Sequence, residues 1–184
     1  EPKVAAVGAG LDISKPSGNM VIDIGGGTTD IAVLSLGDIV TSTSLNVAGD
    51  TLDAEIIKYV KDKYKLLIGD RTAEEIKTTI GCAFGASKDD VMDVRGRDLV
   101  TGLPTSITVT SEELELAMRD SLQQVVTACR TVLEKTPPEL AADIVTRGIV
   151  LTGGGALLNG LDELLRNELH IPVYIAQNAL TCVA

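Results

Sequence analysis

The chain has 184 residues, of which 45% are hydrophobic, so it can bury a core of substantial size. Acidic residues outnumber basic residues by 26 to 16, and the resulting net charge of −10 disfavours nucleic acid as a partner. The sequence contains neither the ~20-residue apolar stretch that a membrane-spanning helix needs nor a signal-peptide pattern at its start. Its three cysteines are widely spaced and match no metal-binding or disulfide pattern, so we expect a globular protein of the cytoplasm.

The first predicted elements are a short helix and three strands. Apolar runs at residues 19–24, 31–36 and 39–47 alternate with glycine-containing turns, which is typical of a β-meander. Asp50 can cap the helix that follows, in which apolar residues recur at helical spacing as far as about Lys65. Because the sequence opens inside one predicted helix and stops where another would start, we expect a portion of a longer protein.

The middle of the chain carries two helix-start patterns. Residues 72–75 have the S/T-x-x-E form of a capping box, which predicts the start of a second helix. Strands are predicted at residues 91–99 and 106–110, separated by a loop that contains glycine and proline. A second capping box at residues 110–113 predicts the start of a long helix, which a pair of prolines ends.

The last part of the chain predicts a βαβ unit. It consists of a strand at residues 148–152, a helix from 156 to about 168, and a strand at residues 172–176. The order of meander, α/β insert, long helix and βαβ unit indicates an α/β protein in which one lobe interrupts another. The predicted lobes comprise residues 1–48 with 116–184, and residues 49–115.

A first candidate binding segment lies between the first two strands. Its glycines permit a tight turn whose bare N–H groups can approach phosphate oxygens. The aspartate at the strand end can hold Mg²⁺ through water, and the two threonines can donate to phosphate. The alternative is a glycine-rich hairpin turn with no ligand. The residues concerned are Asp23, Gly25, Gly26, Gly27, Thr28 and Thr29.

A second glycine cluster stands where a buried strand changes to a predicted helix. A helix N-terminus has free N–H groups and a positive dipole end, and the missing side chains leave room for a nucleoside against the backbone. A tight strand-to-helix connection is the alternative. The residues concerned are Gly153, Gly154, Gly155, Ala156 and Leu157, after Thr152.

Several other nucleotide motifs are excluded. Neither glycine cluster completes the G-x-G-x-x-G fingerprint of dinucleotide-binding proteins, and the Gly-Lys-Ser/Thr of a P-loop is absent from the sequence. His170 is the only histidine, which excludes a histidine-based triad, and we expect it at the end of a helix.

A third segment, residues 74–77, combines two acidic residues with a lysine. Glu75 can be the capping-box partner of Thr72, and Glu74 and Lys77 can form a solvated ion pair on one helix face. The sequence of this segment, which also includes Ile76, therefore does not decide between a binding role and a purely structural one.

These segments occur in order together with Glu1-Pro2-Lys3-Val4-Ala5-Ala6 and Pro137-Pro138-Glu139-Leu140. Over essentially its whole length the chain resembles the MreB/Mbl family of bacterial actins, and Asp30, where many MreB sequences carry Glu, favours an Mbl-like member. The resemblance implies the second half of an actin-like (ribonuclease H-like) ATPase fold, with the two lobes as subdomains IIA and IIB. It also implies ATP and Mg²⁺ as cofactors.

The same resemblance implies roles for the segments. Residues 23–30 match the second phosphate loop, residues 152–157 the adenosine motif, and residues 74–77, including Glu74 and Lys77, the segment beside the purine. Glu1 matches the acidic residue that positions the hydrolytic water. The phosphate loop of the opposite lobe has no counterpart in this sequence, so we expect the chain alone to be inactive as an ATPase.

For the intact protein the resemblance implies a slow Mg²⁺-dependent ATPase that polymerises into filaments. Such filaments help to determine rod cell shape by organising the cell-wall synthesis machinery, and they lie at the inner face of the cell membrane through parts absent from this chain. Two alternatives stay open at this point. One is another member of the actin, sugar-kinase and chaperone superfamily, and the other is a module that acts only in binding or assembly.

Overall fold

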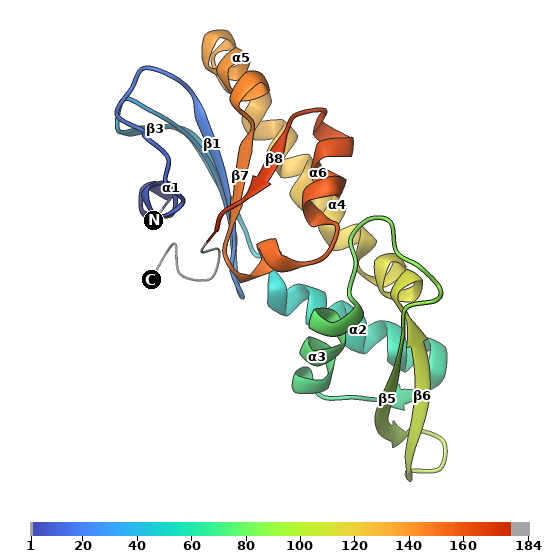
Figure 1. Ribbon diagram of the computed structural model, residues 1–184. Helices are drawn as coiled ribbons and strands as arrows, with labels where there is room; N and C mark the ends of the chain where they lie inside the picture. Colours follow the sequence, from blue (N-terminus) through green and yellow to red (C-terminus); the bar gives the residue numbers. More distant parts are fainter. Residues whose placement is uncertain (1, 178–184) are drawn as a thin grey trace.

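The computed structural model describes residues 2–177 and contains two β-sheets (Figure 1). One sheet has five strands in the order β3-β2-β1-β7-β8, and the other has three strands in the order β4-β5-β6. Glu1 and the expected helix start near the end of the sequence lie outside the described residues.

The predicted meander and βαβ unit together build the five-stranded sheet. Strand β1 pairs antiparallel with β2, which pairs antiparallel with β3, while β7 lies parallel to both β1 and β8. Both sequence predictions are therefore confirmed. The strands are β1 (Asn19–Ile24), β2 (Thr29–Ser35), β3 (Asp38–Leu45), β7 (Ile149–Thr152) and β8 (Val173–Ile175).

Both faces of this sheet are covered in its middle strands. Because side chains alternate between the two faces of a strand, Val21 and Leu34 join Ala5 and Ala6 of helix α1 (Pro2–Gly8) in a small cluster. Their neighbours in β1 and β2, such as Ile22, belong to the main core on the opposite face. This explains why β1 is buried along its whole length.

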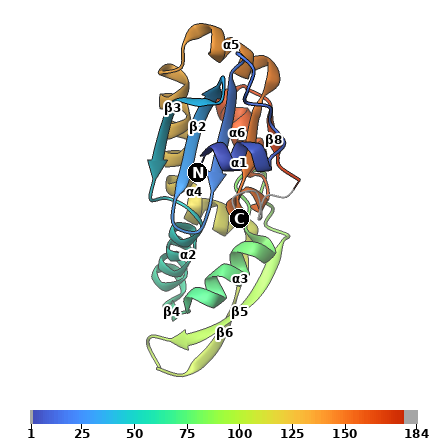
Figure 2. The same cartoon turned by 90° about the vertical axis from the view of Figure 1, so that its left-hand side faces the viewer.

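The three-stranded sheet carries two helices of its own and lies at the far end of the molecule (Figure 2). Helix α2 contacts both α3 and β4, and α3 contacts β5. The elements are α2 (Gly49–Tyr64), β4 (Leu66–Leu67), α3 (Asp70–Ile80), β5 (Val91–Asp98) and β6 (Pro104–Thr110).

Two predicted helix starts in this region are wrong. Helix α2 begins at Gly49, so Asp50 lies inside its first turn and does not cap it. Helix α3 begins at Asp70, directly after Gly69, so Thr72 is already helical and the predicted capping box does not exist. The acidic side chain of Asp70 lies in the first turn, where it is favoured by the positive end of the helix dipole.

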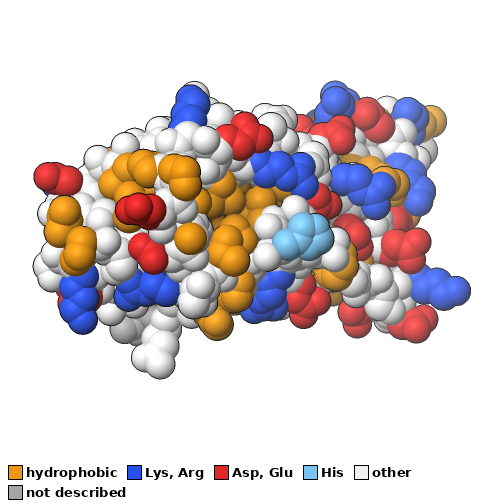
Figure 3. Space-filling view, turned by 90° about the horizontal axis from the view of Figure 1, so that it is seen from above, with side chains coloured by type: hydrophobic (Ala, Val, Ile, Leu, Met, Phe, Trp, Pro, Cys, Tyr) orange, Lys and Arg blue, Asp and Glu red, His pale blue; other side chains and the backbone are white. Residues whose placement is uncertain are grey.

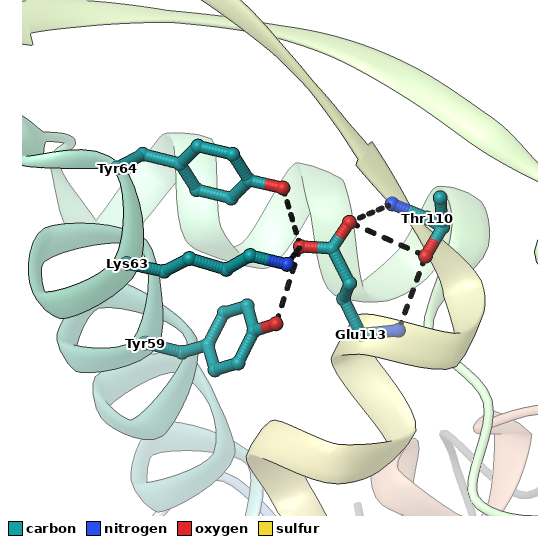
Figure 4. Close-up of polar contacts among 5 residues, drawn as sticks. All are labelled: Tyr59, Lys63, Tyr64, Thr110 and Glu113. Carbon is teal, nitrogen blue, oxygen red and sulfur yellow. Dashed lines mark hydrogen bonds and ion pairs between the residues drawn. The ribbon is translucent and has the colours of Figure 1, made fainter.

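Helix α4 (Ser111–Glu134) begins at the second predicted capping box, which is confirmed. The Glu113 N–H donates to Thr110 Oγ1 at 3.2 Å, and the Thr110 N–H donates to Glu113 Oε1 at 3.3 Å (Figure 4). Along its length α4 contacts α2 and β6 near one end and β2, β3 and α6 near the other. The predicted lobe boundary falls inside this continuous helix, so the boundaries of the lobes stay a prediction.

The segment after β7 differs from the prediction of a helix from Ala156. It forms a short 3₁₀ turn (Gly154–Leu157), and helix α6 (Leu161–Leu169) begins only after Gly160. Gly160 has φ +77°, and a Cβ there would lie 2.5 Å from the Phe84 carbonyl oxygen. A helix cannot pass through a residue with that backbone conformation.

Helix α5 (Pro138–Arg147) begins at the second proline of the pair and contacts β1. His170 ends α6 as expected, and its side chain is exposed, as Figure 3 shows in pale blue. Among the helices of residues 2–177, none combines the length and the apolar character that crossing a membrane requires.

Candidate functional site

The first glycine segment is an open turn whose carbonyl groups are anchored. Gly25 closes the turn by donating its N–H to the Thr28 carbonyl at 3.0 Å. The carbonyl of Gly25 accepts from the Gly49 N–H at 3.0 Å, and that of Gly26 accepts from the Asp50 N–H at 2.8 Å. Gly26, Gly27 and Thr28 are exposed, so the start of α2 fixes the turn from one side and leaves its tip accessible.

The second glycine segment lies directly against the end of β1. Asp23 is aligned with Thr152 in the parallel β1–β7 pair, so both segments leave the sheet at the same edge. A Cβ on Gly153 would lie 2.4 Å from the Ile24 carbonyl oxygen and 2.5 Å from Asp23 Oδ1. A Cβ on Gly155 would lie 2.3 Å from Ile24 Cγ2. The close approach of the two segments therefore depends on these glycines.

The third segment reaches the first through Lys77. Its Nζ lies 2.9 Å from Asp53 Oδ1 and donates to the Gly49 carbonyl at 3.2 Å. Gly49 is the residue whose N–H binds the Gly25 carbonyl. Lys77 thus pairs with Asp53, not with Glu74, and connects α3 to the first glycine turn.

Four of the predicted contact residues do not fit a direct contact with a ligand. Ile76 and Ala156 are fully buried in the main core. Thr29 is also fully buried, and its hydroxyl donates to the Val47 carbonyl at 2.5 Å, so it cannot also donate to a phosphate. Gly153 is buried beneath Ile24. These residues shape the site without facing its surface.

The acidic residues of the third segment are exposed. Glu74 and Glu75 both lie on the solvent side of α3, and Glu75 has no capping partner because Thr72 lies within the helix. The charge of Glu74 adds to burial in raising the pKa of Asp53, so Glu74 lies near the Lys77–Asp53 contact. Of the two acidic residues, Glu74 is therefore the better candidate for a ligand contact.

Asp53, which the sequence reasoning did not single out, contacts the third segment through Lys77. It is only 9% exposed, and burial raises the pKa of its carboxyl, an effect that Lys77 partly opposes. Its position in the sequence could have identified it. Leu52, Ile56 and Val60 mark the buried side of α2, and a charged residue on that side, such as Asp53, needs a partner.

Two open grooves of the described surface lie away from this site. One, of about 510 Å³, lies between β3 and α4, and the other, of about 390 Å³, lies between α2 and α4. Neither is lined by the glycine segments. The exposure of Gly27, Thr28 and Leu157 makes the site an open part of the surface. Residues 2–177 also contain no group of three or more metal-ligating side chains.

Comparison with known proteins identifies the family. The family model described as MreB/Mbl protein matches residues 1–184. The chain belongs to the MreB/Mbl family. It is 61% identical to the cell shape-determining protein Mbl of Bacillus cereus and 50% identical to the cell shape-determining protein MreB of Escherichia coli, over all of its residues in each case. It covers 55% and 53% of these proteins, so it spans about half the length of its MreB/Mbl relatives.

Solved structures of MreB5 and MamK share the fold. The chain superposes on MreB5 of Spiroplasma citri bound to AMPPNP with a TM-score of 0.95 and 42% identity, covering 99% of the chain and 55% of that protein. MreB5 bound to ADP gives a TM-score of 0.96. A MamK filament structure, at 22% identity and a TM-score of 0.81, shares the fold over 99% of the chain and 55% of its own. The predicted family and actin-like fold are confirmed.

Proposed function

We propose that this chain forms one wall of an ATP-binding cleft in a longer bacterial actin. The observation that carries the proposal is the convergence of three distant segments. The two glycine segments touch at Ile24, and Lys77 joins the first of them through Gly49. A nucleotide needs its phosphate and base contacts side by side, which this arrangement supplies. The nucleotides bound to Spiroplasma citri MreB5 support the same assignment.

Each segment has a proposed role in binding. The exposed tip of the first turn presents backbone N–H groups to the phosphates. The exposed Thr28 hydroxyl donates to Asp30 Oδ2 at a long 3.4 Å, and it would have to leave that contact to donate to a phosphate. The 3₁₀ turn at residues 154–157, with Leu157 exposed on it, would contact the nucleoside. Glu74 and Lys77 lie on the base side. Because Lys77 is already bound to Asp53, it acts as a fixed positive group there.

The proposed Mg²⁺ ion fits a water-mediated site. Magnesium keeps several waters and often takes only one or two carboxylates together with phosphate oxygens. Asp23 supplies one carboxylate at the edge where both glycine segments leave the sheet. The ion would supply charge neutralisation at the phosphates.

Hydrolysis and assembly belong to the intact protein in this proposal. Glu1 would orient the attacking water in a slow ATPase, and the chain alone would lack the opposite wall. The intact protein would self-associate into filaments in the cytoplasm, at the inner face of the cell membrane, and would organise the cell-wall synthesis machinery. The cell shape-determining names of the relatives support this role. Residues 1–48 with 116–184 would form subdomain IIA, and residues 49–115 subdomain IIB.

The test is ATP binding by a variant of the exposed turn in the full-length protein. A Cβ on Gly27 meets no atom within 4 Å, so Gly27→Val should fold normally. A branched side chain there would occupy the space proposed for phosphate, and ATP binding should be lost. Gly69→Val is the matched control, because a Cβ on Gly69 also meets no atom within 4 Å.

Calorimetric titration with ATP and Mg²⁺ gives the affinity, and circular dichroism checks folding. The proposal fails if folded Gly27→Val binds ATP as well as the control does. Glu1→Ala should slow phosphate release while leaving the ATP affinity unchanged. The isolated chain should bind ATP weakly and show no steady turnover.

A further inference from the structure

Asp53 forms a buried ion pair within the proposed site. The carboxylate comes from α2 and the Lys77 ammonium group from α3, and their side chains are only 12% and 16% exposed. At 2.9 Å the contact is close, yet among the described residues Oδ1 has no partner with hydrogen-bond geometry. The pair is therefore held by charge attraction.

This ion pair is the first link in a chain of contacts. Lys77 Nζ donates to the carbonyl of Gly49 at 3.2 Å, and the N–H of Gly49 donates to the carbonyl of Gly25 at 3.0 Å. The carboxylate of Asp53 thus holds the Lys77 ammonium group in place. Lys77 in turn contacts Gly49, the residue that anchors the first glycine turn. Movement of Lys77 would break this contact between α3 and the residue that anchors the turn.

Stability alone does not account for the pair. Removing two charges from water costs several kcal/mol, and a buried ion pair is often no more stabilising than apolar side chains of similar size. Burial, together with the nearby carboxylates of Glu74 and Asp50, raises the pKa of Asp53, and only Lys77 opposes this shift. A costly pair at this place indicates a geometric role.

We propose that Asp53 is a positioning residue for the nucleotide site, which holds Lys77 at the Gly49 carbonyl and so fixes α3 relative to the first glycine turn. The inference rests on the proposed function, because it assigns Lys77 to the nucleotide-binding wall. Asp53 itself need not touch the nucleotide. Its effect on binding passes through Lys77.

A double-mutant cycle in the full-length protein tests this dependence. The variants are Asp53→Asn, Lys77→Met and the double variant, and the measurement is ATP affinity in the presence of Mg²⁺. Asp53→Asn keeps the size of the side chain but removes its charge, and we expect about tenfold weaker binding. In the Lys77→Met background the same change should have less than about a twofold effect, because no ammonium group is left to position.

The double variant leaves no unpaired charge in the site, so it should fold even if a single variant is unstable. Asp62→Asn, an equal charge change on the exposed side of α2, should leave the affinity unchanged. Equal losses from Asp53→Asn in both backgrounds would overturn the positioning role. A lower melting temperature with unchanged affinity would show a purely structural role. If Lys77→Met and Gly27→Val both bind ATP normally, the proposed function itself is wrong.

Discussion

Replacing Glu113 by Ala should destabilise the chain measurably. The carboxylate of Glu113 accepts from Tyr64 at 2.6 Å, from Tyr59 at 3.2 Å and from Lys63 at 3.1 Å (Figure 4). It also takes part in the cap at Thr110. These contacts join the end of α2 to the start of α4, so one side chain holds two helices and the end of β6 together.

The expected loss can be estimated from these contacts. Each tyrosine hydrogen bond to the largely buried carboxylate contributes about 1 kcal/mol, and loss of the reciprocal cap costs about 0.5–1 kcal/mol. Lys63 is exposed, so no energy is assigned to it. The sum is about 2.5–3 kcal/mol, which for a chain of this length lowers the Tm by about 5–12 °C.

Thermal unfolding followed by circular dichroism measures the change. Glu112→Ala is the matched control, because Glu112 occupies the same helical turn and is exposed. It removes the same charge near the helix start and makes the same change in helix propensity. If the two variants melt at temperatures within about 1 °C of each other, the contacts of Glu113 do not stabilise the fold as argued.

Three further outcomes are expected. Burial raises the pKa of Glu113, but the hydrogen bonds from Tyr64 and Lys63 outweigh burial and leave this pKa below its ordinary value of 4.5. The stability that the ionised carboxylate contributes should therefore be lost as the pH falls below 4.5 and through the pKa of the folded state. In urea titrations, the free energy of unfolding of Glu113→Gln should fall less steeply with decreasing pH than that of the unchanged protein. Gly153→Ala should unfold at a lower temperature than Gly102→Ala, since both have positive φ but only Gly153 meets backbone closely. Ile56→Ala should cost about 2–5 kcal/mol in urea unfolding, against less than about 0.5 kcal/mol for exposed Val100→Ala.

The strands and the family could be predicted from the sequence because their signals are local. Alternating or continuous apolar runs between glycine turns identified the meander, and the capping pattern at Thr110 identified α4 correctly. The same pattern at Thr72 predicts a helix start that the structure does not have. A capping box requires an extended backbone at its first residue, and in this helix the N-cap residue with an extended backbone is Gly69. Sequence spacing does not fix that backbone conformation.

The site was predicted only in part, for a geometric reason. The family resemblance implies residues 74–77 as one binding segment, but consecutive residues of a helix face different directions. Ile76 therefore points into the core, while Glu74 faces solvent. Asp53 was missed because its partner Lys77 comes from another helix. Only the packing of α2 against α3 brings the two charges together.

Helix α4 has a consequence for how the molecule can deform. With 24 residues it is ~36 Å long, and it takes part in the packing of both sheets. The buried residues of the two regions belong to one continuous core cluster. Because α4 is one continuous helix, a displacement of the β5–β6 hairpin would tilt the whole helix and so move its contacts with the five-stranded sheet. The length of α4 sets the size of this effect: a small rotation of the helix at one end becomes a larger displacement of its other end.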